Sequence, residues 1–183
     1  MTEPDGAIPP LPPLPPRQSE PVYFPVSLAK LGVMSFFTFG GYEIYWFYRQ
    51  WEHEKRRTGE DIWPVARAMF SPLFYYTLLT GIEPQLDPAE RAALPSLGLL
   101  AAGYFVWVSL WRLPDPYWLI SSFSFVPLLP FQRAANQLNR RLAPDASLND
   151  QYTAANLGGL VLGALFLALI VLGLLAGEAH APP

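Results

Sequence analysis

The chain has 183 residues, of which 51% are hydrophobic, 15% aromatic and only 15% charged, whereas a soluble domain carries about 25% charged residues. Its 12 basic and 15 acidic side chains give a net charge of −3 and no basic face for a run of phosphates, which argues against nucleic-acid binding. The absence of cysteine excludes disulfides, thiolate catalysis and cysteine-ligated metals.

Residues 1–22 are expected to form a proline-rich tail outside the folded domain. Residues 8–16 cannot build a helix, because proline lacks the amide hydrogen and restricts φ, so polyproline II is expected. Pro12, Pro15 and Arg17 fit the P-x-x-P-x-R pattern of an SH3-domain ligand, although a solvated spacer is the simpler interpretation. The N-terminus is not expected to be a signal peptide, because acidic and proline residues occupy the positions where a signal peptide has a basic region and an apolar core.

The first apolar segment covers residues 24–48 and contains two charged residues, Lys30 and Glu43. Gly40 and Gly41 interrupt it, so it is expected to be kinked or to run as two short helices. Lys30 lies near one end, from which its long side chain can reach the aqueous interface. The aromatic residues after the glycines predict the belt found where a helix leaves the hydrocarbon.

Residues 49–61 are the most charged part of the chain. Basic and acidic side chains alternate there, which predicts a solvent-exposed helix with i,i+4 pairs such as Glu52 with Arg56. His53 is expected to be solvated. The only other histidine is His180, so neither has a second ligand at the spacing of a metal site.

Four more apolar segments follow in the chain. Residues 65–82 and 94–113 are each expected to be membrane segments, and residues 154–177 include an uncharged run that can cross a hydrocarbon core of about 30 Å. Residues 117–131 are too short for a full crossing and contain two prolines, which favours a re-entrant or tilted piece.

The placement of lysine and arginine favours a topology in which residues 117–131 turn back. Residues 49–67 and 132–151 then both lie on the cytoplasmic side, which carries nine basic residues, and both termini lie outside. The expected fold class is all-α, a polytopic transmembrane helical bundle of about four spans plus a short re-entrant or tilted helix. This bundle comprises residues 23–178, and residues 179–183 form a tail.

Residues 30–51 read KLGVMSFFTFGGYEIYWFYRQW, and a charged stretch and RAMFSPLFYY follow. This arrangement resembles a family of small bacterial inner-membrane proteins known only as a domain of unknown function, whose members show the motif T-[FL]-G-x-Y-x-x-Y-W-F-Y-x-x-W. Thr38 to Trp51 match the motif, with Gly41 where members more often have a bulkier apolar residue. The later LPDPYW and LLPFQRAANQLN stretches are also similar, so the resemblance covers roughly residues 24–140. It implies a bacterial inner membrane and brings no activity with it.

Glu43 is the strongest candidate for a functional polar group, because a carboxylate inside a membrane segment is costly. It could take up a proton, or it could pair with a cation such as Arg49 or Arg112. Arg112 and Asp115 flank Pro114 at a turn and could form an ion pair or bind a lipid head group. A capped, kinked turn explains these two residues equally well.

The last apolar segment carries two G-x-x-x-G patterns, Gly159 with Gly163 and Gly173 with Gly177. Both pairs lie near one face of a helix and would let another helix approach closely. Packing within the same molecule is favoured slightly over pairing with another chain.

The sequence contains no G-x-S-x-G, H-E-x-x-H or P-loop motif, so no catalytic residue, cofactor or metal is expected. The favoured function is a non-enzymatic membrane scaffold or accessory subunit that acts through helix–helix contacts. The alternative is a small transporter or channel in which Glu43 couples to an ion or a proton. The expected partners are the lipid bilayer and either other membrane proteins or a second copy of the chain.

Overall fold

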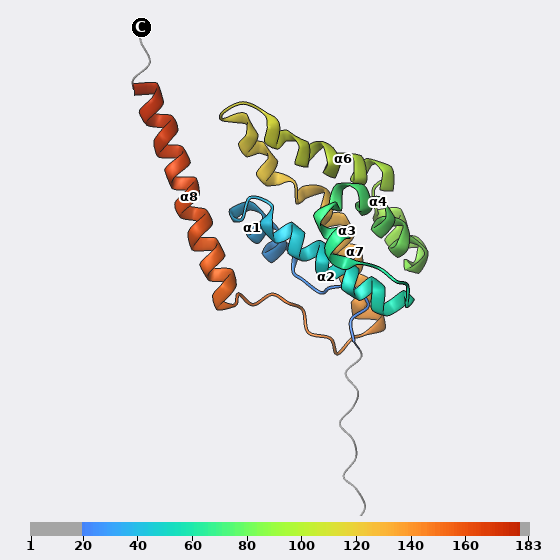
Figure 1. Ribbon diagram of the computed structural model, residues 1–183. Coiled ribbons are helices and arrows are strands. Elements are labelled where there is room, and N and C mark those ends of the chain that lie inside the picture. The colour runs from blue at the N-terminus through green and yellow to red at the C-terminus, as the bar shows by residue number, and fades with distance from the viewer. Residues whose placement is uncertain (1–19, 180–183) are drawn as a thin grey trace, which may run out of the picture.

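The computed structural model describes residues 20–179, with side chains as far as residue 176. Over that range the regular structure is helical, as Figure 1 shows, and the all-α class is confirmed. The proline-rich residues 1–19, with the SH3-ligand pattern, lie outside the described residues, as does His180. The α-helices are α1 (Leu28–Phe37), α2 (Gly41–Thr58), α3 (Pro64–Met69), α4 (Ser71–Ile82), α5 (Pro88–Ala93), α6 (Leu97–Ser109), α7 (Leu129–Leu142) and α8 (Ala154–Ala179).

Helices α1 and α2 are separated by a sharp break within the predicted segment 24–48. Phe39 and Gly40 have φ values of 50° and 83°, a left-handed conformation that a helix cannot contain. The Thr38 hydroxyl joins the two helix ends, since it donates to Met34 O at 2.7 Å and accepts from Tyr42 N at 2.8 Å. Of the two arrangements that the sequence left open, the structure has two separate helices.

The other predicted membrane segments are also divided into short pieces. Segment 65–82 changes direction at Phe70 between α3 and α4. Segment 94–113 becomes α6 and a 3-10 turn, and segment 117–131 is mostly 3-10 helix, over Tyr117–Phe123 and Val126–Leu128. Helices α1, α4 and α6 have 10, 12 and 13 residues, so each is only about 15–20 Å long. Each is shorter than a hydrocarbon core of about 30 Å.

Helix α8 is the exception among the described helices. Its residues Ala154–Ala176 are, by length and composition, long and apolar enough to cross a membrane, and no other helix of the described part meets that condition. Nearly all of this stretch lies at the surface of the chain, and Figure 1 shows α8 standing at one side of the body, next to α1. The structure thus supports one of the predicted spans and does not establish a bundle of four.

The glycine face of α8 packs on the end of α1. A methyl group added at Gly163 would overlap Phe37 O, and one at Gly159 would lie 3.7 Å from Thr38 Cγ2. Gly173 has nothing within 4 Å, and the surroundings of Gly177 lie outside the described side chains. The close contact is therefore within the chain at the first glycine pair, the arrangement that the sequence slightly favoured.

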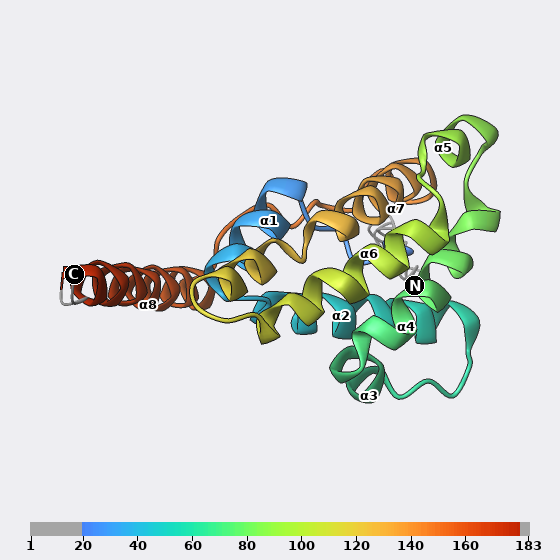
Figure 2. The same ribbon diagram turned by 90° about the horizontal axis from the view of Figure 1, so that it is seen from above.

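The core of the body is a set of aromatic rings around α2. Trp46 and Phe47 are fully buried and contact each other with ring centroids 4.8 Å apart. Trp46 contacts Phe131 of α7 at 5.6 Å, and Phe47 contacts Tyr75 of α4 and Tyr104 of α6 at 5.7 and 5.3 Å. Figure 2 shows these helices gathered in one body with α8 projecting from it. Ring edges packed on ring faces add to the apolar burial that holds α2 in place.

An extended segment, residues 22–27, passes through this body and is held by amide side chains of α7. Asn139 pairs with both polar groups of Tyr23, accepting from Tyr23 N at 3.1 Å and donating to Tyr23 O at 2.8 Å. Asn136 donates to Val26 O at 2.8 Å. These bonds satisfy peptide groups that would otherwise be buried unpaired.

Gln50 and Gln132 complete this network from α2 and α7. Gln50 accepts from Phe24 N at 3.1 Å, and Gln132 donates to Phe24 O at 3.0 Å. The oxygen of Gln132 accepts from Trp46 Nε1 at 2.7 Å and from Gln50 Nε2 at 3.0 Å. Both glutamine side chains are fully buried, so the network ties the aromatic core to the extended segment.

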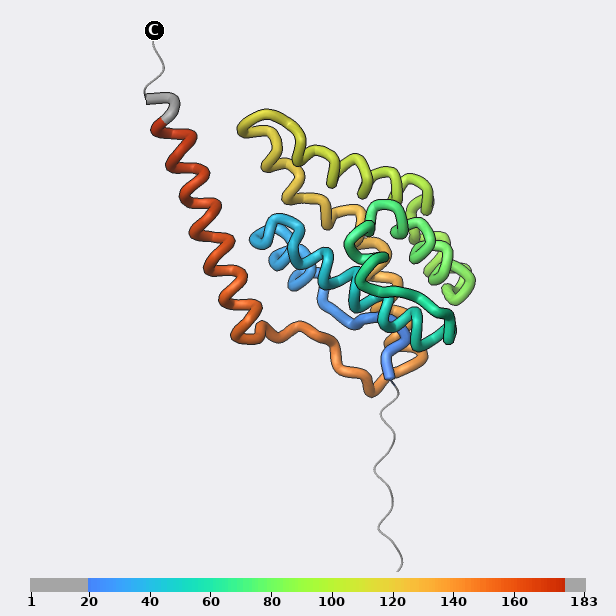
Figure 3. Tube along the Cα trace, viewed as in Figure 1, coloured from blue at the N-terminus to red at the C-terminus, as the bar shows by residue number. Residues whose placement is uncertain are grey.

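The other edge of the extended segment meets the stretch between α7 and α8, which Figure 3 traces back along the lower edge of the body. Asn149 N donates to Pro25 O at 2.9 Å. Lys30 Nζ donates to Asn149 Oδ1 at 2.7 Å and to Gln151 O at 2.5 Å. Lys30 is only 2% exposed, so the predicted snorkelling is wrong. The buried ammonium group of Lys30 requires hydrogen-bond acceptors, and the stretch before α8 supplies them. Lys30 therefore holds this stretch against α1.

The replacement Gly163→Ala should separate α8 from α1, because the new methyl group would overlap the Phe37 carbonyl group. Overpacking of this kind costs about 1–3 kcal/mol, so the melting temperature in detergent should fall. The matched control is Gly173→Ala, which meets open space and should leave the melting temperature unchanged or higher, since alanine favours helix. Equal melting temperatures for the two variants would contradict the α1–α8 contact.

Candidate functional site

Glu43 lies just after the break between α1 and α2, in the first turn of α2. Its side chain is 2% exposed. The Ser124 hydroxyl donates to Glu43 Oε1 at 2.7 Å. Tyr104 also lies against this carboxyl group, and its hydroxyl pairs with Ser71 Oγ at 3.2 Å. Two hydroxyl groups therefore surround the carboxyl group that the sequence singled out.

The carboxyl group faces a cavity of about 400 Å³ at the meeting point of the broken segments. Its walls come from the α1–α2 break, the start of α4, the end of α6 and the 3-10 stretch after Tyr117. Hydroxyl groups of Thr38, Ser71, Ser121 and Ser124 line it together with apolar side chains such as Trp111. The arrangement can hold a small polar species or a proton beside Glu43.

No ion pair found among residues 20–176 includes Glu43. Arg49 pairs with Glu52 at 3.0 Å instead. Arg112 is exposed and lies 5.6 Å from the ring of Trp111. The structure thus gives Glu43 hydroxyl partners rather than the cation that the sequence suggested as one explanation.

Arg112 and Asp115 are not joined to each other. Asp115 accepts from Trp118 Nε1 at 2.7 Å, a local contact across the turn. Both residues are exposed, so they lie outside the cavity although Trp111 contributes to its wall. The ion pair that the sequence offered as one explanation is therefore absent between these two described residues.

The charged half of α2 also differs from the expectation. Within the helix the ion pairs are spaced i,i+3, Arg49 with Glu52 and Glu54 with Arg57. Lys55 pairs with Asp61 beyond the helix end, and Arg56 does not pair with Glu52. Glu54 accepts from Arg57 Nε at 3.1 Å and is only 8% exposed. One side of this half-helix is therefore buried, with the Glu54 carboxylate close to Gly81 of α4.

His53 is 5% exposed, so the expectation that it is solvated is wrong. Its Nδ1 lies 2.9 Å from Pro21 O, a contact that a neutral imidazole makes by donating from Nδ1. Over the described residues no group of three or more histidine or acidic side chains could hold a metal ion. His53 instead attaches α2 to the N-terminal segment.

The sequence analysis did not identify the buried amide side chains of α2 and α7 that form hydrogen bonds with residues distant in the sequence. Gln50, Gln132, Asn136 and Asn139 are all buried and hydrogen-bonded. The only available signal was the spacing of the three α7 amides, which lie on one helical face. That face carries no charge, unlike the rest of the polar stretch 132–151.

Comparisons with models of protein families, with curated proteins and with solved structures find no match. The resemblance to the family of small bacterial inner-membrane proteins therefore stays a prediction.

The His53 side chain should make the folded state sensitive to acid. Burial first, and the positive charge of Arg56 second, lower the pKa of His53 from 6.5 to about 4, with Arg49 also lowering it and Glu52 and Pro21 O opposing the shift. Above pH 6.5 the ring is neutral in folded and unfolded chains alike. As the pH falls from 6.5 towards 4, only the unfolded chain takes up this proton, so stability is lost in that window.

The variant His53→Gln keeps a donor for Pro21 O and cannot titrate there. Between pH 7 and pH 4.5 its melting temperature should therefore fall less than that of the natural protein. The measurement is thermal unfolding in detergent at a series of pH values. Parallel curves for the two proteins would mean that His53 does not contribute to the acid sensitivity.

Proposed function

We propose that this protein is a non-enzymatic scaffold or accessory subunit of a bacterial inner membrane, which acts through apolar helix contacts. The observation that carries the proposal is the set of exposed apolar side chains on α8 and on the body that the described chain leaves uncovered. Monomeric soluble proteins rarely expose contiguous apolar patches of more than a few hundred Å². A surface of this kind requires lipid or a partner protein.

Helix α8 supplies the first part of that surface. Its 26 residues span about 39 Å, which exceeds the hydrocarbon thickness of about 30 Å. Leu162, Leu165, Leu169 and Leu172 are each at least 59% exposed. Because lipid tails are as apolar as leucine, these side chains suit the bilayer, and the glycine face binds α1.

The body supplies the second part. Trp63, Met69, Phe70 and Leu73 of the α3–α4 region are 60–72% exposed. Leu99, Phe105 and Val106 of α6 are 51–68% exposed. These helices are too short to cross singly, so multi-pass insertion would require α3 with α4, or α6 with its 3-10 extension, to cross as bent pairs.

The charged segments support a common orientation for the body. His53 and Arg56 of α2 line the same cavity as Ser147 and Asn149 of the stretch before α8. Residues 49–56 and 146–149 therefore meet at one cavity, and the basic residues of 49–67 and 132–151 favour the cytoplasmic side for both segments.

A photo-cross-linking residue placed at Leu73 tests the scaffold proposal. In native membranes we expect one protein adduct of constant mass from Leu73, which is 67% exposed on α4. The comparison positions are Leu169, on the lipid-facing side of α8 and 66% exposed, and Glu60 in the charged loop. Neither should give that adduct. Lipid adducts alone from Leu73 would show that the α4 face meets only the bilayer, and the scaffold proposal would be wrong.

A second candidate function is transport of a proton or a small ion with Glu43 as the coupling group. The specific observation is a buried carboxyl group that faces a cavity at broken helices and has hydroxyl neighbours instead of a cation. Discontinuous helices that meet at a polar site are a common feature of transporters.

Glu43→Gln tests this alternative. Glutamine keeps an oxygen that can accept from Ser124, so the melting temperature should stay near that of the natural protein, whereas proton flux into liposomes should be abolished. Glu60→Gln, at an exposed loop position, is the control and should keep full flux. Absence of flux with the natural protein, or a Glu43→Gln variant that retains it, would eliminate the coupling role.

A further inference from the structure

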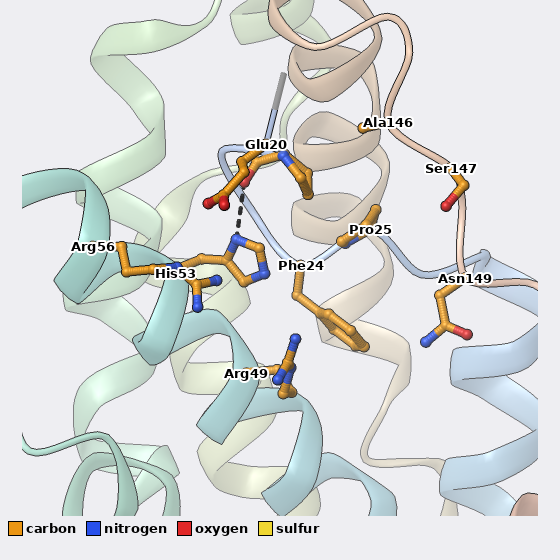
Figure 4. Close-up of a pocket in the computed structure, with 10 residues that line it drawn as sticks. Glu20, Phe24, Pro25, Arg49, His53, Arg56, Ala146, Ser147 and Asn149 are labelled. Carbon is orange, nitrogen blue, oxygen red and sulfur yellow. Dashed lines mark hydrogen bonds between the residues drawn. The ribbon is translucent and has the colours of Figure 1, made fainter. Parts of the chain in front are cut away.

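A second cavity, of about 540 Å³, lies at the end of the molecule where the charged half of α2 meets the stretch before α8. Figure 4 shows Arg49, His53 and Arg56 on the α2 side, Phe24 and Glu20 on the N-terminal segment, and Ser147 and Asn149 across from them. Three chain segments therefore build it, and the N-terminal segment is hydrogen-bonded to both of the others, to α2 through Gln50 and to the stretch before α8 through Asn149.

Unused hydrogen-bond donors gather at this cavity. Arg56 is exposed and takes part in no hydrogen bond or ion pair among the residues that the structure describes. Arg49 forms an ion pair with Glu52 through Nη1, but its Nε is buried and has no hydrogen-bond partner. Buried donors are almost always satisfied in folded proteins, so an unsatisfied guanidinium nitrogen requires an explanation.

The opposite wall adds neutral donors. Asn149 uses its side-chain oxygen for Lys30, which leaves its amide nitrogen without a partner in the described part of the chain. The Ser147 hydroxyl is likewise unengaged there. Glu20 is the only carboxylate in the lining, and it is exposed. The lining therefore holds two guanidinium groups and one solvated carboxylate, and of the two arginines Arg49 also forms an ion pair with Glu52 outside the lining.

We propose that this cavity binds a phosphate group, with Arg49 and Arg56 as its cationic ligands and Asn149 and Ser147 as neutral donors. Arginine is suited to phosphate because its planar fork can donate two parallel hydrogen bonds to the oxygens. A phosphate offers oxygens in several directions and can accept from two guanidinium groups at once, whereas a carboxylate offers two oxygens in one plane.

The phosphate can belong to a lipid head group or to a free ion. Asn149 lies five residues before Ala154, where α8 begins. If α8 crosses the bilayer, as the proposed function holds, the cavity opens close to the membrane surface, and the lipid source rests on that proposal. Binding of free phosphate does not depend on a membrane-spanning α8. The phosphate site and the proposed membrane function can therefore be tested separately.

The test uses the full chain and two probes. The first probe is inorganic phosphate titrated into the protein in neutral detergent, with binding followed by calorimetry. The second is a nanodisc of phosphatidylcholine with phosphatidylglycerol, from which the protein is released and its retained lipid identified by native mass spectrometry. The variants are Arg56→Gln and Arg49→Gln. The control is Arg140→Gln, an exposed arginine of α7 that removes the same charge away from the cavity.

We expect Arg56→Gln to weaken binding about tenfold, the usual effect of one charge-assisted hydrogen bond, and Arg140→Gln to change it little. Arg56 has no partner in the described chain, so its loss should not unfold the protein. Saturable phosphate binding in detergent identifies the free ion as a ligand. Retention of phosphatidylglycerol alone identifies the head group, and both outcomes support the site. No binding of either probe, or equal weakening by Arg140→Gln, would overturn it.

Discussion

The extended backbone of residues 22–27 runs through an apolar body, and its peptide groups must find hydrogen-bond partners there because burial without them costs several kcal/mol. In the described chain a neighbouring backbone supplies such partners only at the isolated bridge between Val26 and Asn149. Amide side chains of α2 and α7 do so from one edge, and Asn149 does so from the other. This requirement sets the spacing between α2 and α7. It also explains why α7 buries three amides beside Phe131 and Leu138. Phe24, Pro25 and Asn149 also line the cavity of Arg49 and Arg56, here called the basic cavity.

The local structure could be predicted where the signal was local. Apolar runs located most helices, and Gly40 marked the break between α1 and α2. The sequence could not reveal that residues 117–128 form 3-10 turns, because short apolar runs with proline fit several conformations. Lys30 and His53 were misassigned for a different reason. Their partners, Asn149 and Pro21, lie 119 and 32 residues away, and a charged or titratable side chain without a visible partner is normally assigned to solvent.

In the candidate site, the sequence could predict the carboxyl group but not its hydrogen-bond partners. Glu43 was identifiable because a carboxylate in an apolar run is expensive wherever it lies. Its partners were not, since Ser124 is 81 residues away and looked like one of several serines in an apolar stretch. The glycine face of α8 was likewise predictable only in part. The pattern predicted close approach, whereas the identity of the partner, the carbonyl group of Phe37, depended on where α1 ends. Tertiary contacts decide what a local pattern binds.

Helix α2 relates the two polar sites to each other. Glu43 and His53 are ten residues apart on one unbroken helix, so they are at most about 15 Å apart along the helix axis. The hydrocarbon core is about 30 Å thick, so half of it is about 15 Å. If the basic cavity lies at the depth of the lipid phosphates, an α2 close to the membrane normal places Glu43 within the hydrocarbon, and a strongly tilted α2 keeps it near the interface. The tilt of α2 therefore determines the surroundings of the Glu43 carboxyl group. Within the hydrocarbon the hydroxyl groups of Ser124 and Tyr104 replace water as its partners, and near the interface they act together with water.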